Sequence, residues 1–385
     1  MILEKKYILY ILFGAFIGYT SWNLSLSMVA LSSLVFAGYF FIENRIKLFL
    51  FIFSYRLIAS YGILFGLVDS DVVGYISSCL LWIFTAFLTT IPFVLLYSHT
   101  LIKKIFLFPI ALILTIIPPI GIVDGVDPIS AAGLFFPGYG YLGLVYYILS
   151  IELISTILTL YIDKISYRWV LSIVILSISI YFNTSQIKIY QGELYAYNTF
   201  YKHTSKYTQK QLVKQINHIN NNQILLAENI LGKFTSKDMN IWHNLHHNKT
   251  VYAGAHIYPK NSNCYHNVIL KINKNNYKTL YIQRVPVPIA MWKPYSNNSA
   301  CMSLKPAQPI KLDNNSTKAV FLICYEIYIP YIYLSSNLDK SNTLIAVANL
   351  WWSHTPSIQK IQHYTLKLWS KLFDLPYILS INRTK

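Results

Sequence analysis

Long apolar runs fill the first half of the 385-residue chain, and they constrain its fold more than any other feature. A helix needs about 20 apolar residues to cross the hydrocarbon core of a bilayer. Only 12% of the residues are charged, whereas soluble domains average about 25%. We therefore predict a membrane α-helical bundle of about seven spans in residues 1–183. The candidate spans are 7–22, 24–42, 48–68, 74–97, 105–123, 131–160 and 169–183.

The basic residues between these runs fall in alternate connections. Ser21–Asn23, Asp69–Asp71 and Asp124–Ser130 hold no Lys or Arg. Cytoplasmic loops are enriched in Lys and Arg, so the pattern predicts a multi-pass protein of the bacterial inner membrane. Its N-terminus is expected in the cytoplasm and its C-terminal domain in the periplasm. The basic connections carry Lys5, Lys6, Arg45, Lys47, Lys103, Lys104, Lys164 and Arg168.

Two ionisable residues, Arg56 and Glu152, fall inside candidate spans. Charges at that depth are costly and usually face a partner or water. The sequence allows either an Arg56–Glu152 pair or separate side chains that reach their nearer interfaces. Outside the spans, Cys264 and Cys301 would be able to pair in an oxidising compartment, but their spacing does not establish a bond.

The second half alternates strand-like and helical patterns, which is typical of a layered α/β domain. We expect a linker over residues 184–205 and a globular domain over 206–385. Most of the formal net charge of +17 lies in this half. A basic face suits anionic lipid or nucleic acid, but the basic residues form no dense run with interleaved aromatic residues. Compositional bias explains them as well, and the outer placement argues against direct nucleic-acid binding.

Three segments of the second half carry reactive side chains just after strand-like runs: Leu225–Asn229, Phe321–Pro330 and Asn349–Trp352. The carboxyl ends of strands are where α/β folds place reactive groups. A thiol needs a nearby base or cation to become a nucleophile, and Glu228 is a candidate base for Cys324. A lone cysteine after an apolar strand is also simply a buried residue in many proteins.

In this order, the segments resemble the nitrilase (carbon–nitrogen hydrolase) superfamily. The most specific stretches are Cys324–Glu326, Trp351-Trp352 and Gln362-His363. The placement of several spans before such a domain is similar to apolipoprotein N-acyltransferase. The resemblance implies an αββα sandwich in which a Glu acts as general base, a Lys stabilises the oxyanion and a Cys forms a thioester. Glu228 and Cys324 match the first and third roles.

The chain departs from that pattern in the segment Tyr281–Met291. Gln283 stands where the superfamily has the Lys, and Met291 stands where it has a supporting Glu. This form resembles TraB-type conjugal transfer proteins, a branch of the same superfamily. A Gln amide donates a hydrogen bond but brings no charge. Lys293 is either a replacement cation that reaches the substrate or a solvated surface residue.

The sequence thus supports two functions. The first is a cysteine-dependent acyl transfer or amide hydrolysis, in which Glu228 activates Cys324, Gln283 holds the oxyanion and Glu326 supports the site. Trp351 and Trp352 are then expected to contact a substrate such as a membrane lipid or lipoprotein. The second is a non-catalytic envelope component of a conjugation or secretion machine. No cofactor and no metal is expected. The superfamily continues past Asn382, so the chain is expected to be a shorter branch or a truncated copy.

Overall fold

The computed structural model describes two compact units that interleave along the chain. A helical unit combines Met1–Lys188 with Tyr328–Leu334 and Thr355–Leu375. A sheet unit comprises the rest: Ile189–Ile327, Ser335–His354 and Pro376–Lys385. The described residues are 5–62, 64–65, 74–123, 125–182, 186–202, 205–260, 262–296, 298–312, 317–353 and 356–383.

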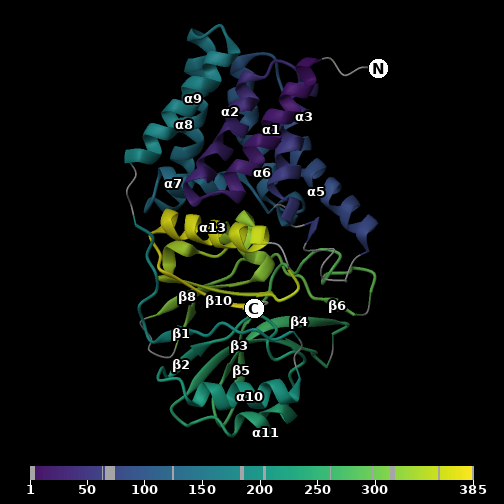
Figure 1. Ribbon diagram of the computed structural model, residues 1–385, viewed down its shortest axis with the longest axis vertical. Helices are drawn as coiled ribbons and strands as arrows, with labels where there is room; N and C mark the ends of the chain where they lie inside the picture. Colours follow the sequence, from purple (N-terminus) through teal and green to yellow (C-terminus); the bar gives the residue numbers. More distant parts are fainter. Residues whose placement is uncertain are drawn as a thin grey trace. The chain divides into compact units, whose positions relative to one another are not determined.

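The helical unit is built from antiparallel helices that run back and forth between its two ends (Figure 1). Apolar residues at helical spacing, with few breaking residues inside each run, favour these helices. The loop predicted at 69–71 and the end of the third candidate span lie outside the described residues. The helices are α1 (Lys5–Asn23), η1 (Leu26–Ser32), α2 (Ser33–Phe41), α3 (Arg45–Ala59), α5 (Tyr75–Leu95), α6 (Leu101–Ile116), η2 (Ile120–Ile122), η3 (Pro128–Ala131), α7 (Ala132–Phe135), α8 (Gly140–Tyr161), α9 (Ile165–Phe182), α12 (Pro330–Leu334) and α13 (Pro356–Phe373).

Within the described residues, two helices are long and apolar enough to cross a membrane: α5 and α8. Among the other candidates, α3 and α6 have 15 and 16 residues. At 1.5 Å per residue they are about 23 Å long, shorter than the hydrocarbon core of about 30 Å. The count of seven spans is therefore not confirmed. Large apolar side chains nevertheless face outward on several of these helices, including Leu9, Phe16, Ile76, Ile102, Phe106 and Leu160.

The basic connections gather at one end of the helical unit. The Lys104 ammonium donates to the carbonyl oxygens of Phe40 and Ile42 at the end of α2. Arg45, at the start of α3, donates to the carbonyl oxygen of Tyr97. The start of α9 joins the same end, where the ring of Trp169 contacts that of Phe41.

The opposite end of the helical unit holds α13. The Ser357 hydroxyl donates to the Asn23 side chain at the end of α1 (2.9 Å), and the Tyr364 hydroxyl donates to the Leu24 carbonyl oxygen (3.0 Å). A Cβ on Gly133 of α7 would lie 2.0 Å from the Leu368 carbonyl oxygen, so only glycine permits this approach. Two segments that follow the strands of the second half thus pack as part of the helical unit.

Arg56 is buried and forms an ion pair with Asp127 (3.1 Å). This corrects the Arg56–Glu152 pair that the sequence allowed, because the ion-pair partner of Arg56 is Asp127. Asp127 lies in the connection before η3, where its carboxylate also accepts the backbone N–H of Ile129. Glu152 is buried in α8, and its Oε1 has no hydrogen-bond partner among the described residues. The sequence did not indicate Asp127, because it marks depth in a helix but not which loops fold inward.

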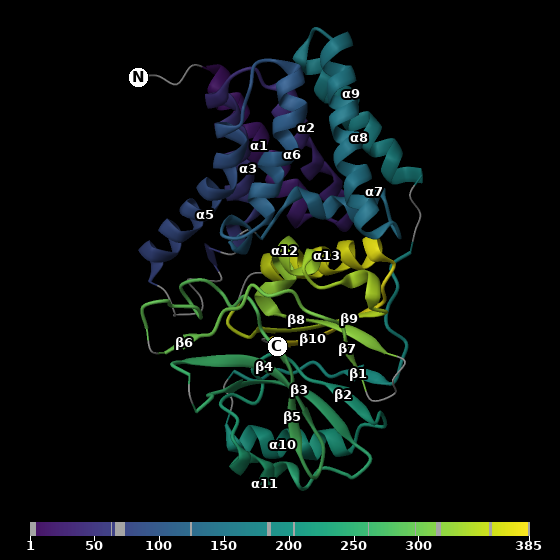
Figure 2. The ribbon, with the colours of Figure 1, turned by 180° about the vertical axis from the view of Figure 1, so that it is seen from behind.

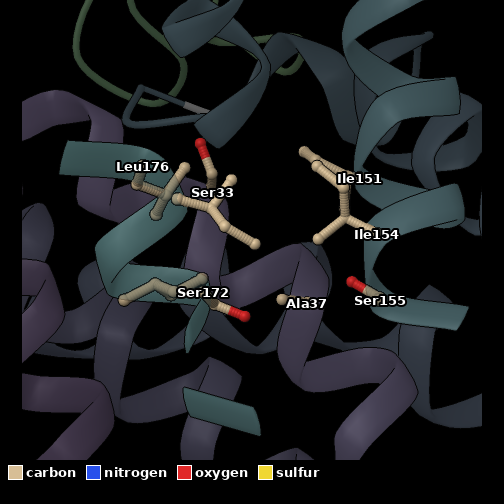
Figure 3. Close-up of a pocket in the computed structure, with 9 residues that line it drawn as sticks. Ser33, Ala37, Ile151, Ile154, Ser155, Ser172 and Leu176 are labelled. Carbon is tan, nitrogen blue, oxygen red and sulfur yellow. The ribbon is translucent and has the colours of Figure 1, made fainter. Parts of the chain in front are cut away.

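A small cavity of about 40 Å³ lies between α2, α8 and α9. Figure 3 shows apolar side chains such as Ile151 and Ile154 lining it, with the hydroxyls of Ser155 and Ser172 among them. No carboxylate or thiol is among the residues that line it. This cavity therefore offers none of the chemistry that the sequence predicts.

The sheet unit packs two sheets face to face, and Figure 2 shows α10 and α11 against the outer face of one of them. The six-stranded sheet has the order β1-β2-β3-β4-β5, with β6 paired to β4, and the four-stranded sheet has the order β10-β9-β8-β7. A continuous apolar core lies between α10, α11 and the first sheet. The elements are β1 (Leu194–Ala196), α10 (Lys206–Asn217), β2 (Gln223–Leu225), η4 (Ser236–Asp238), α11 (Met239–Trp242), β3 (Thr250–Ile257), β4 (Cys264–Ile272), β5 (Tyr277–Ile282), β6 (Ser299–Ala300), β7 (Ile310–Lys311), β8 (Lys318–Ile323), η5 (Cys324–Tyr328), η6 (Leu338–Lys340), β9 (Thr343–Leu350) and β10 (Tyr377–Arg383).

The period of two along a strand decides which residues face the space between the sheets. In β4, Val268, Leu270 and Ile272 join the core beneath α10, so Asn267 points the other way, toward the second sheet. Tyr281 of β5 also points inward and stacks on Phe321 of β8, with ring centroids 6.1 Å apart. The inner faces therefore carry the polar residues that form the candidate site.

A disulfide joins Cys264 to Cys301, with their Cα atoms 5.1 Å apart. The bond links the start of β4 to the segment after β6, and it settles the pairing that the sequence left open. Cys79 and Cys324 are not part of a disulfide.

Candidate active site

Glu228 follows β2 at the end of a buried strand. β2 is parallel to both β1 and β3, and the chain turns at Asn229, which has a φ of 50°. A Cβ on Gly254 of β3 would lie 2.5 Å from the Glu228 Cα. The missing side chain at Gly254 therefore lets the Glu228 backbone lie directly against the neighbouring strand.

Cys324 follows β8 directly and begins η5. Its φ is 48°, in the left-handed region that non-glycine residues rarely adopt. Such backbone conformations cost about 1–3 kcal/mol and cluster at functional sites. Cys324 is 8% exposed, so the strained turn holds a buried residue at the end of the strand.

The Glu228 carboxylate meets the Cys324 thiol, and the two side chains are hydrogen-bonded. The Glu228 carboxylate accepts two further hydrogen bonds. Asn267 Nδ2 donates to Oε1 (2.8 Å), and the Asn349 backbone N–H donates to Oε2 (3.1 Å). Asn349 lies near the end of β9, so three strand ends supply this cluster. The structure thus brings together Glu228 and Cys324, which are 96 positions apart in the sequence.

The groups that shift the pKa of Glu228 include no cation. The pKa of Glu228 is raised to about 7: burial and the nearby Glu326 raise it, while hydrogen bonds from Cys324, Asn267 and Asn349 lower it. His256 pairs with Asn267 across β3 and β4, and burial lowers its pKa to about 4, so its ring is neutral at pH 7. Glu228 therefore changes protonation near neutral pH, as a general base should.

Gln283 lies just after β5 and is buried. Its backbone N–H donates to the Asn267 carbonyl oxygen (2.8 Å), which extends the pairing of β4 with β5. Its side-chain oxygen accepts from Asn267 Nδ2 (2.9 Å), and its side-chain nitrogen donates to the Ile323 carbonyl oxygen (3.0 Å). Gln283 thus reaches the residue immediately before Cys324.

Glu326 is completely buried and lies two residues after Cys324. The Tyr281 hydroxyl lies 3.0 Å from both of its oxygens. Backbone N–H groups of Arg284 (2.6 Å) and Ile323 (2.9 Å) donate to the same carboxylate. Burial raises the pKa of Glu326, whereas Arg284 and these N–H groups lower it. The carboxylate therefore ties the turn around Cys324 to the end of β5.

The remaining candidates lie in the turn after β9 and in the segment between β5 and β6. Trp351 and Trp352 are half-buried in the turn after β9. Lys293 is half-buried, and its backbone N–H donates to the Ser299 hydroxyl (2.8 Å). Met291 lies in the same segment, where its N–H donates to the Val287 carbonyl oxygen.

Sequence reasoning missed Asn267, Arg284 and the backbone of Asn349. A signal for Asn267 was present, because it is a polar residue directly before the apolar run Val268–Leu270 of β4. The guanidinium of Arg284 donates to the hydroxyls of Tyr281 and Ser335. Among the described residues, no group of three or more His, Cys, Asp or Glu side chains is arranged to hold a metal ion.

Solved structures similar to the chain come from the carbon–nitrogen hydrolases. The carbon–nitrogen hydrolase of Helicobacter pylori G27 aligns with 48% of this chain and 71% of its own, at 15% identity and a TM-score of 0.36. No family model matches the chain.

Two relatives are similar in sequence over most of the chain, and both are named conjugal transfer proteins. A probable conjugal transfer protein TraB of Sinorhizobium fredii is 26% identical over 341 residues, which cover 86% of each chain. The conjugal transfer protein TraB of Agrobacterium fabrum is 25% identical over 290 residues, which cover 71% of this chain and 65% of the relative. These matches confirm the predicted resemblance to TraB-type conjugal transfer proteins.

Proposed function

We propose that the protein is a membrane-anchored enzyme that acylates and deacylates Cys324 with Glu228 as general base. The observation that carries this proposal is the hydrogen bond between the Glu228 carboxylate and the Cys324 thiol at the strained end of β8. A nucleophile needs such a base within hydrogen-bond reach. The reaction class is acyl transfer or amide hydrolysis through a thioester.

The steps follow from the two side chains. Glu228 accepts the thiol proton, and the sulfur attacks the carbonyl carbon of an ester or amide. The tetrahedral intermediate collapses when the leaving alkoxide or amine takes the proton from Glu228. Water or an acceptor amine then attacks the thioester, Glu228 accepts its proton, and the Cys324 thiolate leaves and recovers a proton from Glu228. No cofactor is needed for this cycle.

The membrane placement rests on the helical unit. Its outward-facing apolar side chains suit lipid, since soluble monomers rarely expose large contiguous apolar patches. Its basic connections lie at one end, and α13 packs at the other. By the positive-inside rule the basic end is cytoplasmic, so we propose a multi-pass inner-membrane protein with the sheet unit in the periplasm. The Cys264–Cys301 disulfide suits that oxidising compartment.

The membrane topology is tested with reporters fused at the C-terminus. An alkaline phosphatase fusion is expected to be active and a fluorescent protein that matures only in the cytoplasm is expected to be dark. The reverse pattern would overturn the periplasmic placement.

A second function, a non-catalytic part of a conjugation apparatus, is favoured by Gln283. Where the superfamily has a lysine, this amide is already bonded to Asn267 and Ile323. The names of the relatives point to a conjugation system as the setting of either function. A membrane lipid or lipoprotein remains the substrate we propose for the enzyme.

Acylation of Cys324 separates the two functions. Purified protein in detergent is incubated with an activated acyl donor from pH 6 to pH 9, and the adduct is located by peptide mass spectrometry. The enzyme gives a hydroxylamine-labile adduct on Cys324 that is absent in Cys324→Ala. Wild-type protein with no adduct above the Cys324→Ala background would favour the non-catalytic function.

A further inference from the structure

The amide of Gln283 has a defined orientation in the site. The Ile323 carbonyl oxygen can only accept a hydrogen bond, so the Gln283 group that faces it must be the nitrogen (3.0 Å). The Gln283 oxygen is then the atom that faces Asn267 (2.9 Å). Asn267 must therefore present its nitrogen, whichever way an amide is initially drawn.

Asn267 uses that one nitrogen twice. An amide nitrogen carries two hydrogens, and here one serves the Gln283 oxygen while the other serves Glu228 Oε1 (2.8 Å). The Asn267 oxygen is left with no hydrogen-bond partner among the described residues, although the residue is 2% exposed. The opposite orientation of the Asn267 amide would place its oxygen against the oxygens of Gln283 and Glu228. The observed orientation avoids this repulsion, although it leaves the Asn267 oxygen without a hydrogen bond.

The three groups form one directed series of donors, from Gln283 to Ile323 and from Asn267 to both Gln283 and Glu228. One end of the series is the carbonyl of the residue that precedes the nucleophile, and the other end is the base. Every member except Glu228 is neutral. The series therefore sets the distance between base and nucleophile without an ion pair.

We infer that Asn267 is a positioning residue of the active site: with Gln283 it forms a neutral strut that holds Glu228 against Cys324. This inference rests on the proposed function. It also changes the role of Gln283, whose amide supports the backbone before Cys324 instead of holding the oxyanion. Asn267 itself acts through Glu228 and does not touch the sulfur.

The strut predicts a change in the pH dependence of Cys324 reactivity, which a residue that only fills space would not cause. The Asn267 bond stabilises the ionised form of Glu228, so its loss must raise the pKa of that carboxyl. A hydrogen bond to a charged group corresponds to about one to two pKa units. Asn267→Leu, which keeps the volume and removes both donors, should shift the pH midpoint of Cys324 reactivity upward by about one unit or more.

The test measures the rate of iodoacetamide alkylation of Cys324 from pH 5 to pH 10, in the full-length protein in detergent, by peptide mass spectrometry. Gln209→Leu is the matched control, because it removes another buried amide of the sheet unit, bonded to Leu231 and Trp242. The control should lose stability but keep the wild-type midpoint. A second variant, Gln283→Met, cuts the strut at its other end and should shift the midpoint in the same direction by a smaller amount.

A wild-type midpoint in the folded Asn267→Leu protein would overturn the inference. If Asn267→Leu does not fold, Gln283→Met decides, and an unchanged midpoint in that variant overturns the inference in the same way. Alkylation reads the thiol without any acyl donor. A failed acylation assay with a shifted midpoint would therefore reject the proposed function while leaving the strut in place.

Discussion

Two buried carboxylates of the sheet unit, Glu228 and Glu326, differ in their hydrogen-bond partners. Glu326 accepts hydrogen bonds from the backbone N–H groups of Arg284 and Ile323 and from the Tyr281 hydroxyl, which itself accepts from Arg284. Among the described residues, Glu228 has neutral hydrogen-bond partners, one of them the Cys324 thiol. Burial raises the pKa of both carboxyls, and the Arg284 charge counteracts this at Glu326. We therefore expect Glu228 to exchange protons near pH 7 and Glu326 to support the fold.

The largest expected effect is on chemistry at Glu228. Glu228→Gln keeps the shape of the side chain but cannot accept the thiol proton, and a general base typically contributes about 10²–10⁴-fold. We expect the rate of Cys324 acylation at pH 8 to fall by that factor, measured as adduct formed per minute. A Glu228→Gln protein that acylates at the wild-type rate would remove Glu228 from the mechanism.

The same substitution at Glu326 should act on stability instead. Glu326→Gln sets an amide nitrogen against groups that all donate, and removal of one partner from a buried charged network costs about 3–5 kcal/mol. Thermal unfolding in detergent measures the loss, with Glu228→Gln as the matched control. A loss below about 1 kcal/mol would show that the donors around Glu326 do not need a charge.

The pH dependence of stability should report on the protonation of Glu228. Because the pKa of Glu228 rises from 4.5 to about 7 on folding, the folded protein keeps a proton that the unfolded chain releases, and stability falls as pH rises through this window. Glu228→Gln should therefore be more stable than wild type by about 1–3 kcal/mol at pH 8. The gain should vanish near pH 4.5. Equal stability of the two proteins at pH 8 would mean that folding does not raise the pKa of Glu228.

The smallest expected effect is at the edge of the Glu326 network. Ser335→Ala removes one acceptor from the Arg284 guanidinium (3.0 Å), which still contacts Ser336 and Tyr281. A loss of about 0.5–1.5 kcal/mol is expected from one hydrogen bond, with acylation of Cys324 unchanged. An effect as large as that of Glu326→Gln would mean that the guanidinium depends on this one contact.

Much of the candidate site follows from local patterns. Glu228, Cys324 and Glu326 each come just after an apolar strand, where α/β folds place reactive groups, although the structure shows that β2 and β8 belong to two facing sheets. Asn267 was missed because its importance depends on the register between β4 and β5, which places it between Glu228 and Gln283. The Asp127 partner of Arg56 was missed because a loop far along the chain brings it inward, and no local pattern indicates that.

The sequence alone determined the apolar first half, the alternation of basic connections and the choice of Glu228 and Cys324 as the candidate base and nucleophile. These properties are local, because hydropathy, charge and strand ends can be read within a few residues. Only the tertiary structure decided which cysteines bond, which helices of the second half pack with the first, and how Gln283 is oriented. Those outcomes depend on contacts between residues far apart in the chain, and no spacing along the sequence records them.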